Sequence, residues 1–323
     1  MRSSSLPSLH KSQRSSCGQN SLTSLSFQVS NLTGLRQISC VTISEAIARH
    51  ESSLRKAGIE SARVDMEWML VHLLDLSRSK LQLETGRILT LSEQRQLQNL
   101  VEQRGQRIPL QHLLGEVDFH GLRLQVDGRA LVPRPETELL AEAAIEILGK
   151  EVAPRVLDIG TGSGCLAISI AVASSTAHID ALDISADALA LARENAIYHQ
   201  VADRILYMKG DGRELLPSGP YHVIVSNPPY IPTGDLGGLQ PEVRDHDPRL
   251  ALDGGPDGLE FYRALVGNSV ASLHSGGRLL LEVGDNQATA VGELLTDCSW
   301  KIEQILDDLA GTPRIVIATP PVS

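Results

Sequence analysis

The sequence predicts an α/β protein in which a doubly wound, mostly parallel sheet follows a small helical region and a β-hairpin. Two observations carry this prediction. From Arg155 onward, short apolar runs typical of buried strands alternate with segments of helical periodicity, and repeated βα units of this kind build a parallel sheet. Between residues 44 and 107 the apolar residues recur only at helical spacing.

The composition is that of an ordinary globular protein. The chain has 323 residues, of which 42% are hydrophobic and 21% charged, and these values exclude a wholly disordered or fibrous chain. This length favours two domains. No run of 18 apolar residues occurs, so we expect no membrane span.

The charge is spread unevenly along the chain. The net charge is −10, but residues 1–44 hold four basic residues and no acid, so the remainder is strongly acidic. Neutralisation of phosphates drives non-specific binding to nucleic acid, and an acidic body cannot supply it. We therefore expect no direct nucleic-acid partner.

The cysteines and histidines show no metal-binding pattern. Neither the four cysteines nor the ten histidines stand at the spacings of metal ligands or redox pairs. We expect reduced thiols, an intracellular and cytoplasmic protein, and no metal site. The cysteines are Cys17, Cys40, Cys165 and Cys298.

Residues 1–40 are rich in serine, lack acids and show no sustained apolar period, so we predict a disordered extension. Two explanations remain open. A basic, serine-rich segment without acids is typical of a transit peptide, which would imply an organelle. Alternatively, translation begins at Val41, and we favour this reading because the helical pattern starts abruptly there.

Residues 41–108 are predicted to form a helical domain that recognises a partner. A first helix carries Ile43, Ile47 and Leu54 and stops near Gly58. A second and a third helix are expected to begin at serine N-caps. The second, capped by Ser61, would bury Val64, Trp68, Val71 and Leu74, and the third, capped by Ser92, would bury Leu97, Leu100 and Val101.

Residues 109–132 are predicted to be a linker that contains a β-hairpin. Apolar residues alternate on both sides of His120-Gly121, which indicates two strands joined by a tight turn. The catalytic domain would then span residues 133–323. Its first helix is entered through Pro133-Arg134-Pro135-Glu136-Thr137-Glu138 and runs to Leu148.

The rest of the chain supplies the sheet, and ligands of such sheets bind at the carboxyl ends of the strands. The expected strands are 156–159, 179–183, 205–209, 222–226, 278–283, 301–306 and 314–318. The expected helices are 163–173, 186–199, 259–273 and 287–295.

A glycine-rich loop follows the first of these strands. Its glycines would let the backbone turn sharply and approach a ligand. The spacing G-x-G-x-G differs from the G-x-G-x-x-G of dinucleotide sites and is closer to that of enzymes that use S-adenosyl-L-methionine. A tight turn without a ligand is the alternative. The predicted cofactor-binding residues of the loop are Gly160, Thr161, Gly162, Ser163 and Gly164.

Two further strand ends carry candidate cofactor contacts. Asp183 ends the next strand, 23 residues after Gly160, where a carboxylate can accept hydrogen bonds from ribose hydroxyls. Its alternative role is to cap the helix that begins near Ala186, for which Ser185 is an equal candidate. Asp211-Gly212 follows the third strand, where an adenine ring would lie; a plain turn is the alternative.

Ser226-Asn227-Pro228-Pro229-Tyr230, after the fourth strand, points most directly to a reaction. Asn227 offers a side-chain carbonyl, and a proline backbone offers acceptors without competing N–H donors. Two acceptors can hold both protons of a planar NH₂ group while Tyr230 packs on its face. Such a grip raises electron density on a weakly nucleophilic nitrogen and aligns it with a sulfonium methyl group, so that neither a metal nor a strong base is required.

With these motifs, residues 41–320 resemble the HemK/PrmC family of class I methyltransferases, which methylate the glutamine side-chain amide of peptide chain release factors. The segments 109–116 and 133–138 look like family signatures as well. The resemblance implies a Rossmann-like fold, with the glycine loop and Asp183 binding S-adenosyl-L-methionine. Asn227, Pro228, Pro229 and Tyr230 would hold the substrate glutamine, with Asn227 catalytic and also near the cofactor's methyl end.

The resemblance predicts an enzyme that methylates N5 of the glutamine in the Gly-Gly-Gln motif of release factors, acting as a monomer. Three alternatives remain. The first is a glutamine methyltransferase of a ribosomal protein, and the second is an adenine-N6 methyltransferase of nucleic acid, since such enzymes share the Asn-Pro-Pro-Tyr motif. The third is a non-catalytic cofactor-binding module, against which the intact Asn227–Tyr230 segment argues. The acidic body argues against the second. One departure stands out: relatives often carry a large apolar residue after Asp211, where this chain has Gly212.

Overall fold

The computed structural model describes residues 40–149, 151–214 and 216–321. The predicted extension therefore lies outside the described residues, apart from Cys40. The described residues from Val41 onward form one compact unit. Within the described part of the chain, no helix is both long and apolar enough to cross a membrane.

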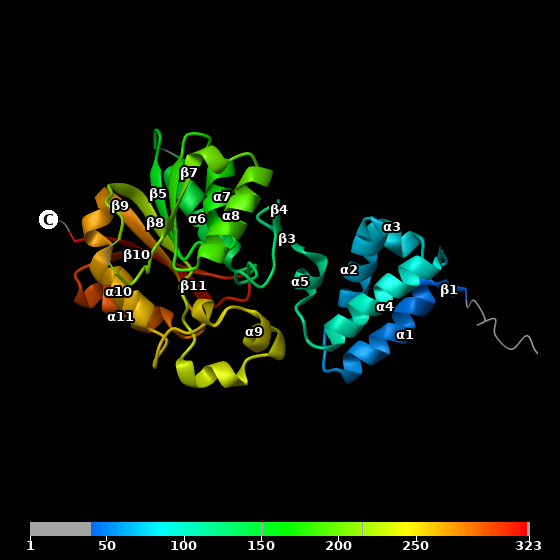
Figure 1. The fold of residues 1–323 in the computed structure, drawn as a ribbon. Helices are drawn as coiled ribbons and strands as arrows, with labels where there is room; N and C mark the ends of the chain where they lie inside the picture. Colours follow the sequence, from blue (N-terminus) through cyan, green and yellow to red (C-terminus); the bar gives the residue numbers. More distant parts are fainter. Residues whose placement is uncertain (1–39, 150, 215, 322–323) are drawn as a thin grey trace, which may run out of the picture. The chain divides into compact units, whose positions relative to one another are not determined.

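A seven-stranded sheet forms the centre of the C-terminal part (Figure 1), in the order β10-β11-β9-β8-β5-β6-β7. The five strands from β9 to β7 are parallel, and β11 runs antiparallel to both of its neighbours. The predicted doubly wound, mostly parallel sheet is thus confirmed. Its strands are β5 (Arg155–Ile159), β6 (His178–Asp183), β7 (Ile205–Lys209), β8 (Tyr221–Ser226), β9 (Leu273–Glu282), β10 (Lys301–Asp307) and β11 (Pro313–Thr319).

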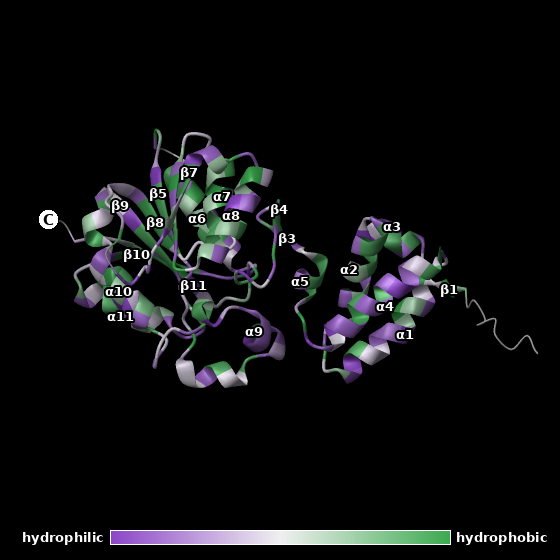
Figure 2. Cartoon of the chain, in the orientation of Figure 1, coloured by the Kyte–Doolittle hydropathy of each residue, from purple (hydrophilic) through white to green (hydrophobic). Residues whose placement is uncertain are grey.

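Helices cover both faces of this sheet because its side chains alternate between two cores. Val156, Val223 and Val225 pack with helices α6, α7 and α8, whereas Leu157 and Ile224 pack with α10 and α11. The central strands are accordingly among the most hydrophobic parts of the chain (Figure 2). The helices are α6 (Thr137–Leu148), α7 (Cys165–Ala173), α8 (Ala186–Tyr198), α10 (Glu260–Asn268) and α11 (Ala288–Asp297).

Two predicted boundaries differ from the structure. Helix α7 begins at Cys165 rather than residue 163, because Gly164 has the left-handed conformation, with φ of 83°, that precedes the first helical turn. Helix α10 ends at Asn268 rather than residue 273. A short 3₁₀ turn follows it, and β9 begins at Leu273, five residues earlier than predicted.

The N-terminal helical region has a hydrophobic core of its own, built from residues between Val41 and Val101. Its helices are α1 (Ile43–Lys56), α2 (Ala62–Leu74), α3 (Arg78–Leu83), α4 (Leu91–Gly105) and α5 (Leu110–Leu114). A two-residue pairing joins β1 (Val41–Thr42) to β2 (Ile88–Leu89). The short helix α3 was not predicted.

The third predicted helix begins at a different cap. Thr90, rather than Ser92, is the N-cap of α4: its hydroxyl accepts from the Glu93 N–H, and the Glu93 carboxylate accepts from the Thr90 N–H. This reciprocal pair needs a glutamate three residues after the cap, which Ser92 lacks because Arg95 stands there. Thr42 and Glu45 cap α1 in the same way.

The predicted buried face of α2 is only partly correct, because Val71 and Leu74 pack against the helical core but Val64 and Trp68 do not. Val64 and Trp68 are 43% and 37% exposed, whereas Met66, Met69 and Leu70 are fully buried. Apolar residues surround most of this helix, so their spacing alone allows more than one inward face. Ser61 precedes α2 as predicted, but its side chain makes no capping hydrogen bond.

The predicted β-hairpin is present between these parts, with β3 (Glu116–Phe119) paired to β4 (Leu122–Gln125). Both turn residues, His120 and Gly121, have positive φ, as a two-residue hairpin loop of this twist requires. Phe119 and Leu124 are buried in the core of the α6–α8 face. The hairpin is therefore anchored to the sheet-containing part of the chain.

Residues 231–254, where no helix or strand is predicted, contain two 3₁₀ turns and the short, hydrophilic helix α9 (Pro241–His246; Figure 2). Glu242 of α9 accepts hydrogen bonds from Arg104 of α4 at 2.8 Å and from Arg107 at 2.5 Å. Burial opposes ionisation, but these two guanidinium groups hold the pKa of Glu242 below its ordinary value. Arg104 is itself buried and also pairs with Asp65 of α2 at 2.7 Å.

We expect Arg104→Met to lower the free energy of unfolding by about 3–5 kcal/mol, because it leaves buried Asp65 without its cation. Urea denaturation measures the change. Arg95→Met, on the exposed side of the same helix, is the matched control. Equal denaturation midpoints for the two variants would show that the network does not stabilise the fold.

Candidate active site

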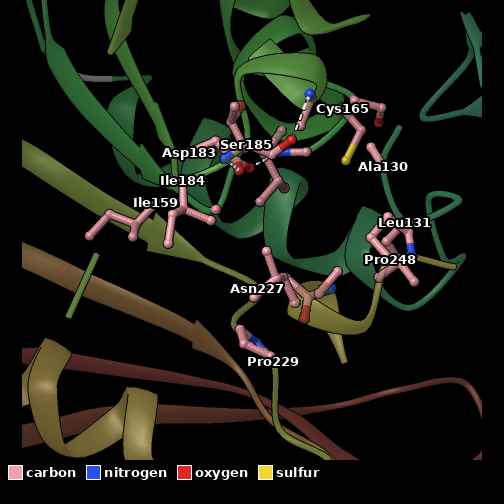
Figure 3. Close-up of a pocket in the computed structure, with 18 of the residues that line it drawn as sticks. Ala130, Leu131, Ile159, Cys165, Asp183, Ile184, Ser185, Asn227, Pro229 and Pro248 are labelled. Carbon is pink, nitrogen blue, oxygen red and sulfur yellow. Dashed lines mark hydrogen bonds between the residues drawn. The ribbon is translucent and has the colours of Figure 1, made fainter. Parts of the chain in front are cut away.

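A cavity lies where the carboxyl ends of β5, β6, β7 and β8 meet (Figure 3). Strand order reverses between β5 and β8, and open α/β sheets bind ligands at such switch points. Asp183 and Ile184 lie on one side of the cavity, and Asn227 and Pro229 lie on the other. The sheet thus brings together residues from four separate strand ends.

The glycine loop forms one wall of this cavity. Gly160, Thr161, Gly162 and Ser163 all line it, and the N–H groups of Gly160 and Thr161 donate to the Leu182 carbonyl of β6. Gly160 and Gly162 have φ of 74° and 55°, conformations that disfavour side chains. The loop therefore presents backbone rather than side chains to the cavity.

Gly164, predicted with the loop, does not line the cavity. A Cβ at this position would stand 3.0 Å from both the Ala192 Cβ and the Ile168 Cδ1. The absence of a side chain here lets α7 approach α8 closely. Its place in the structure is a packing position.

Asp158, which is fully buried at the end of β5, anchors the loop. Its carboxylate accepts from the Thr161 hydroxyl at 2.6 Å and from the Ala167 N–H at 3.2 Å. Burial raises the pKa of Asp158 to about 7, although these hydrogen bonds oppose the shift. The carboxyl holds the loop and the start of α7 together without lining the cavity itself.

Two backbone N–H groups orient the carboxylate of Asp183. One oxygen accepts from Gly162 N–H at 2.9 Å and the other from Ser185 N–H at 2.8 Å. Burial raises the pKa of Asp183, and the backbone hydrogen bonds partly offset this shift. The cap of α8 is Ser185, whose hydroxyl accepts from Ala188 N–H, so capping does not account for Asp183.

Gly212 lines the cavity after β7, where there is no room for a side chain. A Cβ would come within 2.4 Å of the Ile159 Cγ2 and 3.4 Å of the Phe261 Cε1. Phe261, from α10, lines the same part of the cavity. A large apolar side chain at this part of the cavity thus comes from another element, α10, which the sequence analysis did not identify.

The Asn227–Tyr230 segment leaves the end of β8, where the Ser226 hydroxyl donates to the Ile159 carbonyl at 2.8 Å. Asn227 and Pro229 line the main cavity. Pro228 is buried and lines no cavity described here. Tyr230 lines an adjoining cavity, which Asn227 also lines, so Asn227 stands between the two.

Several lining residues escaped the sequence analysis. Arg134 and Thr137 come from the segment 133–138, to which the sequence analysis assigned no ligand contact, and Pro248 and Ala251 come from the segment 231–254. The Arg134 guanidinium pairs with buried Asp247 at 2.7 Å, which ties this segment to the site. No periodicity marks such contacts, because they join loops far apart in the sequence.

The cavity suits an extended ligand with a nucleoside at one end. A backbone-lined wall and the Asp183 carboxylate stand opposite the Asn227 amide. The apolar side chains of Ile184 and Phe261 also line the cavity. These groups can accept from ribose hydroxyls and cover a planar base. The residues present therefore fit S-adenosyl-L-methionine.

Two family models match the chain. Residues 45–115 match the PrmC N-terminal domain, and residues 136–236 match the methyltransferase small domain. Among solved structures, the hMettl16 catalytic domain in complex with the MAT2A 3′UTR hairpin 1 aligns with a TM-score of 0.50. That alignment covers 74% of this chain and 88% of the other at 15% identity, and it shows a shared fold.

The fold and the family models define this chain as an S-adenosyl-L-methionine-dependent methyltransferase. A protein of Deinococcus radiodurans called release factor glutamine methyltransferase is 43% identical over 276 residues, covering 85% of this chain and 96% of that one. A Geobacter sulfurreducens protein of the same name is 41% identical, covering 77% and 87%. The chain belongs to the release factor glutamine methyltransferase family.

We expect Gly212→Ala to destabilise the fold by about 1–3 kcal/mol, because the new methyl group overlaps Ile159. Thermal unfolding measures the loss. Gly234→Ala is the control, since a Cβ there would meet no atom within 4 Å. If both variants unfold at the wild-type temperature, the backbone around residue 212 yields more easily than the structure indicates.

Proposed function

We propose that this enzyme transfers a methyl group from S-adenosyl-L-methionine to the side-chain amide nitrogen of the glutamine in the Gly-Gly-Gln motif of peptide chain release factors. The observation that carries the proposal is the position of Asn227 at the end of β8, between the main cavity and the adjoining one. A donor bound in the first cavity and an amide entering through the second would meet there.

The cofactor is assigned to the main cavity. The backbone of Gly160, Thr161, Gly162 and Ser163 contacts it, and Gly164 supports the loop by close helix packing. The Asp183 carboxylate accepts from ribose hydroxyls. Gly212 leaves space for the adenine, and Phe261 covers it. When bound, S-adenosyl-L-methionine supplies an electrophilic methyl group, so no metal is needed.

The substrate amide is assigned to Asn227, Pro228, Pro229 and Tyr230. The Asn227 Oδ1 and a proline backbone carbonyl accept hydrogen bonds from the two N–H groups of the glutamine side chain, while the Tyr230 ring packs on the amide face. The nitrogen lone pair forms the new N–C bond as the S–C bond breaks and its electrons go to sulfur. The nitrogen then releases one proton to solvent.

The partner is proposed to be a release factor that the helical domain, residues 41–108, recognises. Residues 109–132 link it to the catalytic domain, residues 133–323. We place the enzyme in the cytoplasm as a monomer without a direct nucleic-acid partner. An organellar location follows only if residues 1–40 act as a transit peptide.

Labelled S-adenosyl-L-methionine, offered with a release factor, a ribosomal protein or DNA in separate reactions, tests the substrate. Label should enter the release factor at its Gly-Gly-Gln glutamine. Transfer to the ribosomal protein alone would favour a glutamine methyltransferase of that protein. Transfer to adenine in the DNA would contradict a protein-methylating function.

We expect Asp183→Ala to weaken binding of S-adenosylhomocysteine by about 10- to 100-fold, because each charge-assisted hydrogen bond contributes roughly 1.5–3 kcal/mol. Titration calorimetry measures the dissociation constant. Asp187→Ala, an exposed carboxylate in the first turn of α8, is the control. An unchanged dissociation constant would restrict Asp183 to holding Gly162 and Ser185.

We expect Asn227→Ala to slow methyl transfer by about 100- to 1,000-fold while cofactor affinity falls only modestly, because it removes an acceptor aligned with the reacting nitrogen. Single-turnover rates on a release factor, with cofactor binding measured separately, distinguish the two effects. Asn227→Asp keeps an acceptor, so partial activity there would mark the acceptor as decisive. A near wild-type rate for Asn227→Ala would refute the amide-binding mechanism.

A further inference from the structure

Glu282 is a buried carboxyl beside the catalytic segment that the proposed function leaves without a role. It ends β9, and parallel pairing of Ser226 with Leu281 brings the next residues, Asn227 and Glu282, side by side. Glu282 is 2% exposed, and its Oε2 has no hydrogen-bond partner among the described residues. A carboxyl in such a place requires an explanation.

Thr137 connects Glu282 to Asn227. The Asn227 Nδ2 donates to the Thr137 Oγ1 at 3.1 Å, and Thr137 is itself buried. A threonine hydroxyl that accepts in this way still has one proton to donate. Burial raises the pKa of Glu282 to about 7, while hydrogen bonds from Thr137 and Asn227 act in the opposite direction. Thr137 and Asn227 are thus the neighbouring groups that can donate to this carboxylate.

Resting on the function proposed above, we propose that Glu282 is a positioning residue that fixes the orientation of the Asn227 amide. The Thr137 oxygen and the ionised carboxyl are both acceptors, so they select the NH₂ end of the amide. The Oδ1 is therefore left for the substrate nitrogen. Rotation of the amide by 180° would place its Oδ1 against the carboxylate, so that two acceptors would face each other. The Asn227 NH₂ group would then face the substrate NH₂ group, and two donors cannot form a hydrogen bond.

Protonation of Glu282 removes this selection, because a protonated carboxyl can donate to the Asn227 Oδ1. Methyl transfer should therefore fall by up to about tenfold per pH unit below pH 7 and reach a plateau above it. Five other titratable groups from surrounding elements act on Glu282 or are affected by its charge. They are Arg314 of β11, Glu136 before α6, Tyr230 after β8, Tyr262 of α10 and Cys165 of α7.

The same group should lower the stability of the fold at high pH. Because folding raises the pKa of Glu282, its contribution to stability is complete below about pH 4.5 and is lost as the pH rises through 7. A neutral side chain of the same shape avoids this loss. Glu282→Gln should thus unfold at no lower a temperature than the wild type at pH 8, although it is less active.

The test is the pH dependence of single-turnover methyl transfer to a release factor by Glu282→Gln. A glutamine side chain can donate to the Asn227 Oδ1, so the single-turnover rate constant should fall about 10- to 100-fold at pH 8. The KM for the release factor, from a parallel steady-state assay, should stay within twofold. The step in the pH profile near 7 should disappear. Asp307→Asn, which changes an exposed carboxylate at the end of the edge strand β10, is the control and should keep the wild-type profile.

A second readout does not depend on the substrate. In ¹⁵N-labelled protein, the side-chain NH₂ signals of Asn227, assigned by their loss in Asn227→Ala, should shift with pH around 7 in the wild type and not in Glu282→Gln. A wild-type rate and profile for Glu282→Gln, a lower rate with an unchanged profile, or NH₂ signals insensitive to pH would each overturn the inference. If the wild type does not methylate a release factor, the proposed function fails, and the NH₂ signals alone decide the role of Glu282.

Discussion

Parallel pairing of β6, β5, β8 and β9 is the constraint on which the site depends. Strands paired in parallel end at the same edge of a sheet, so residues that follow them become neighbours however far apart they stand in the sequence. This rule explains why four residues from separate strand ends lie at one edge of the sheet: Gly160, Asp183, Asn227 and Glu282. A hydrogen bond from Ser226 to the Ile159 carbonyl joins the two central strand ends directly.

The sequence predicted features that depend on local pattern. The seven strands, the hairpin at His120-Gly121 and the cavity residues after β5, β6 and β8 all follow from period, turn chemistry or motif. Errors arose where the pattern was ambiguous. Helix α2 is apolar around most of its surface, so Trp68 was assigned to the core in place of Met66 and Met69. The N-cap of α4 depends on the pair Thr90 and Glu93, so a search for a single capping residue selects Ser92 instead.

Other features depend on tertiary contacts and could not be read from one segment. Phe261 reaches the cavity from α10, and the closeness of Glu282 to Asn227 requires the register of β8 against β9. The segment 231–254 has neither a helical nor a strand period. Its placement depends on ion pairs that Glu242 and Asp247 make with distant arginines.

The ion pairs of Glu242 restrict how this chain can be recombined with a relative. Arg104 and Arg107 come from the helical region, whereas Glu242 belongs to the segment between β8 and α10. Consider a chimera that takes its helical region from one parent and its methyl-transferring part from another. One parent would have to supply the two arginines and the other the carboxylate that pairs with them. Otherwise a buried guanidinium would lose one of its two carboxylates. These two parts of the chain are therefore expected to be inherited as a matched pair.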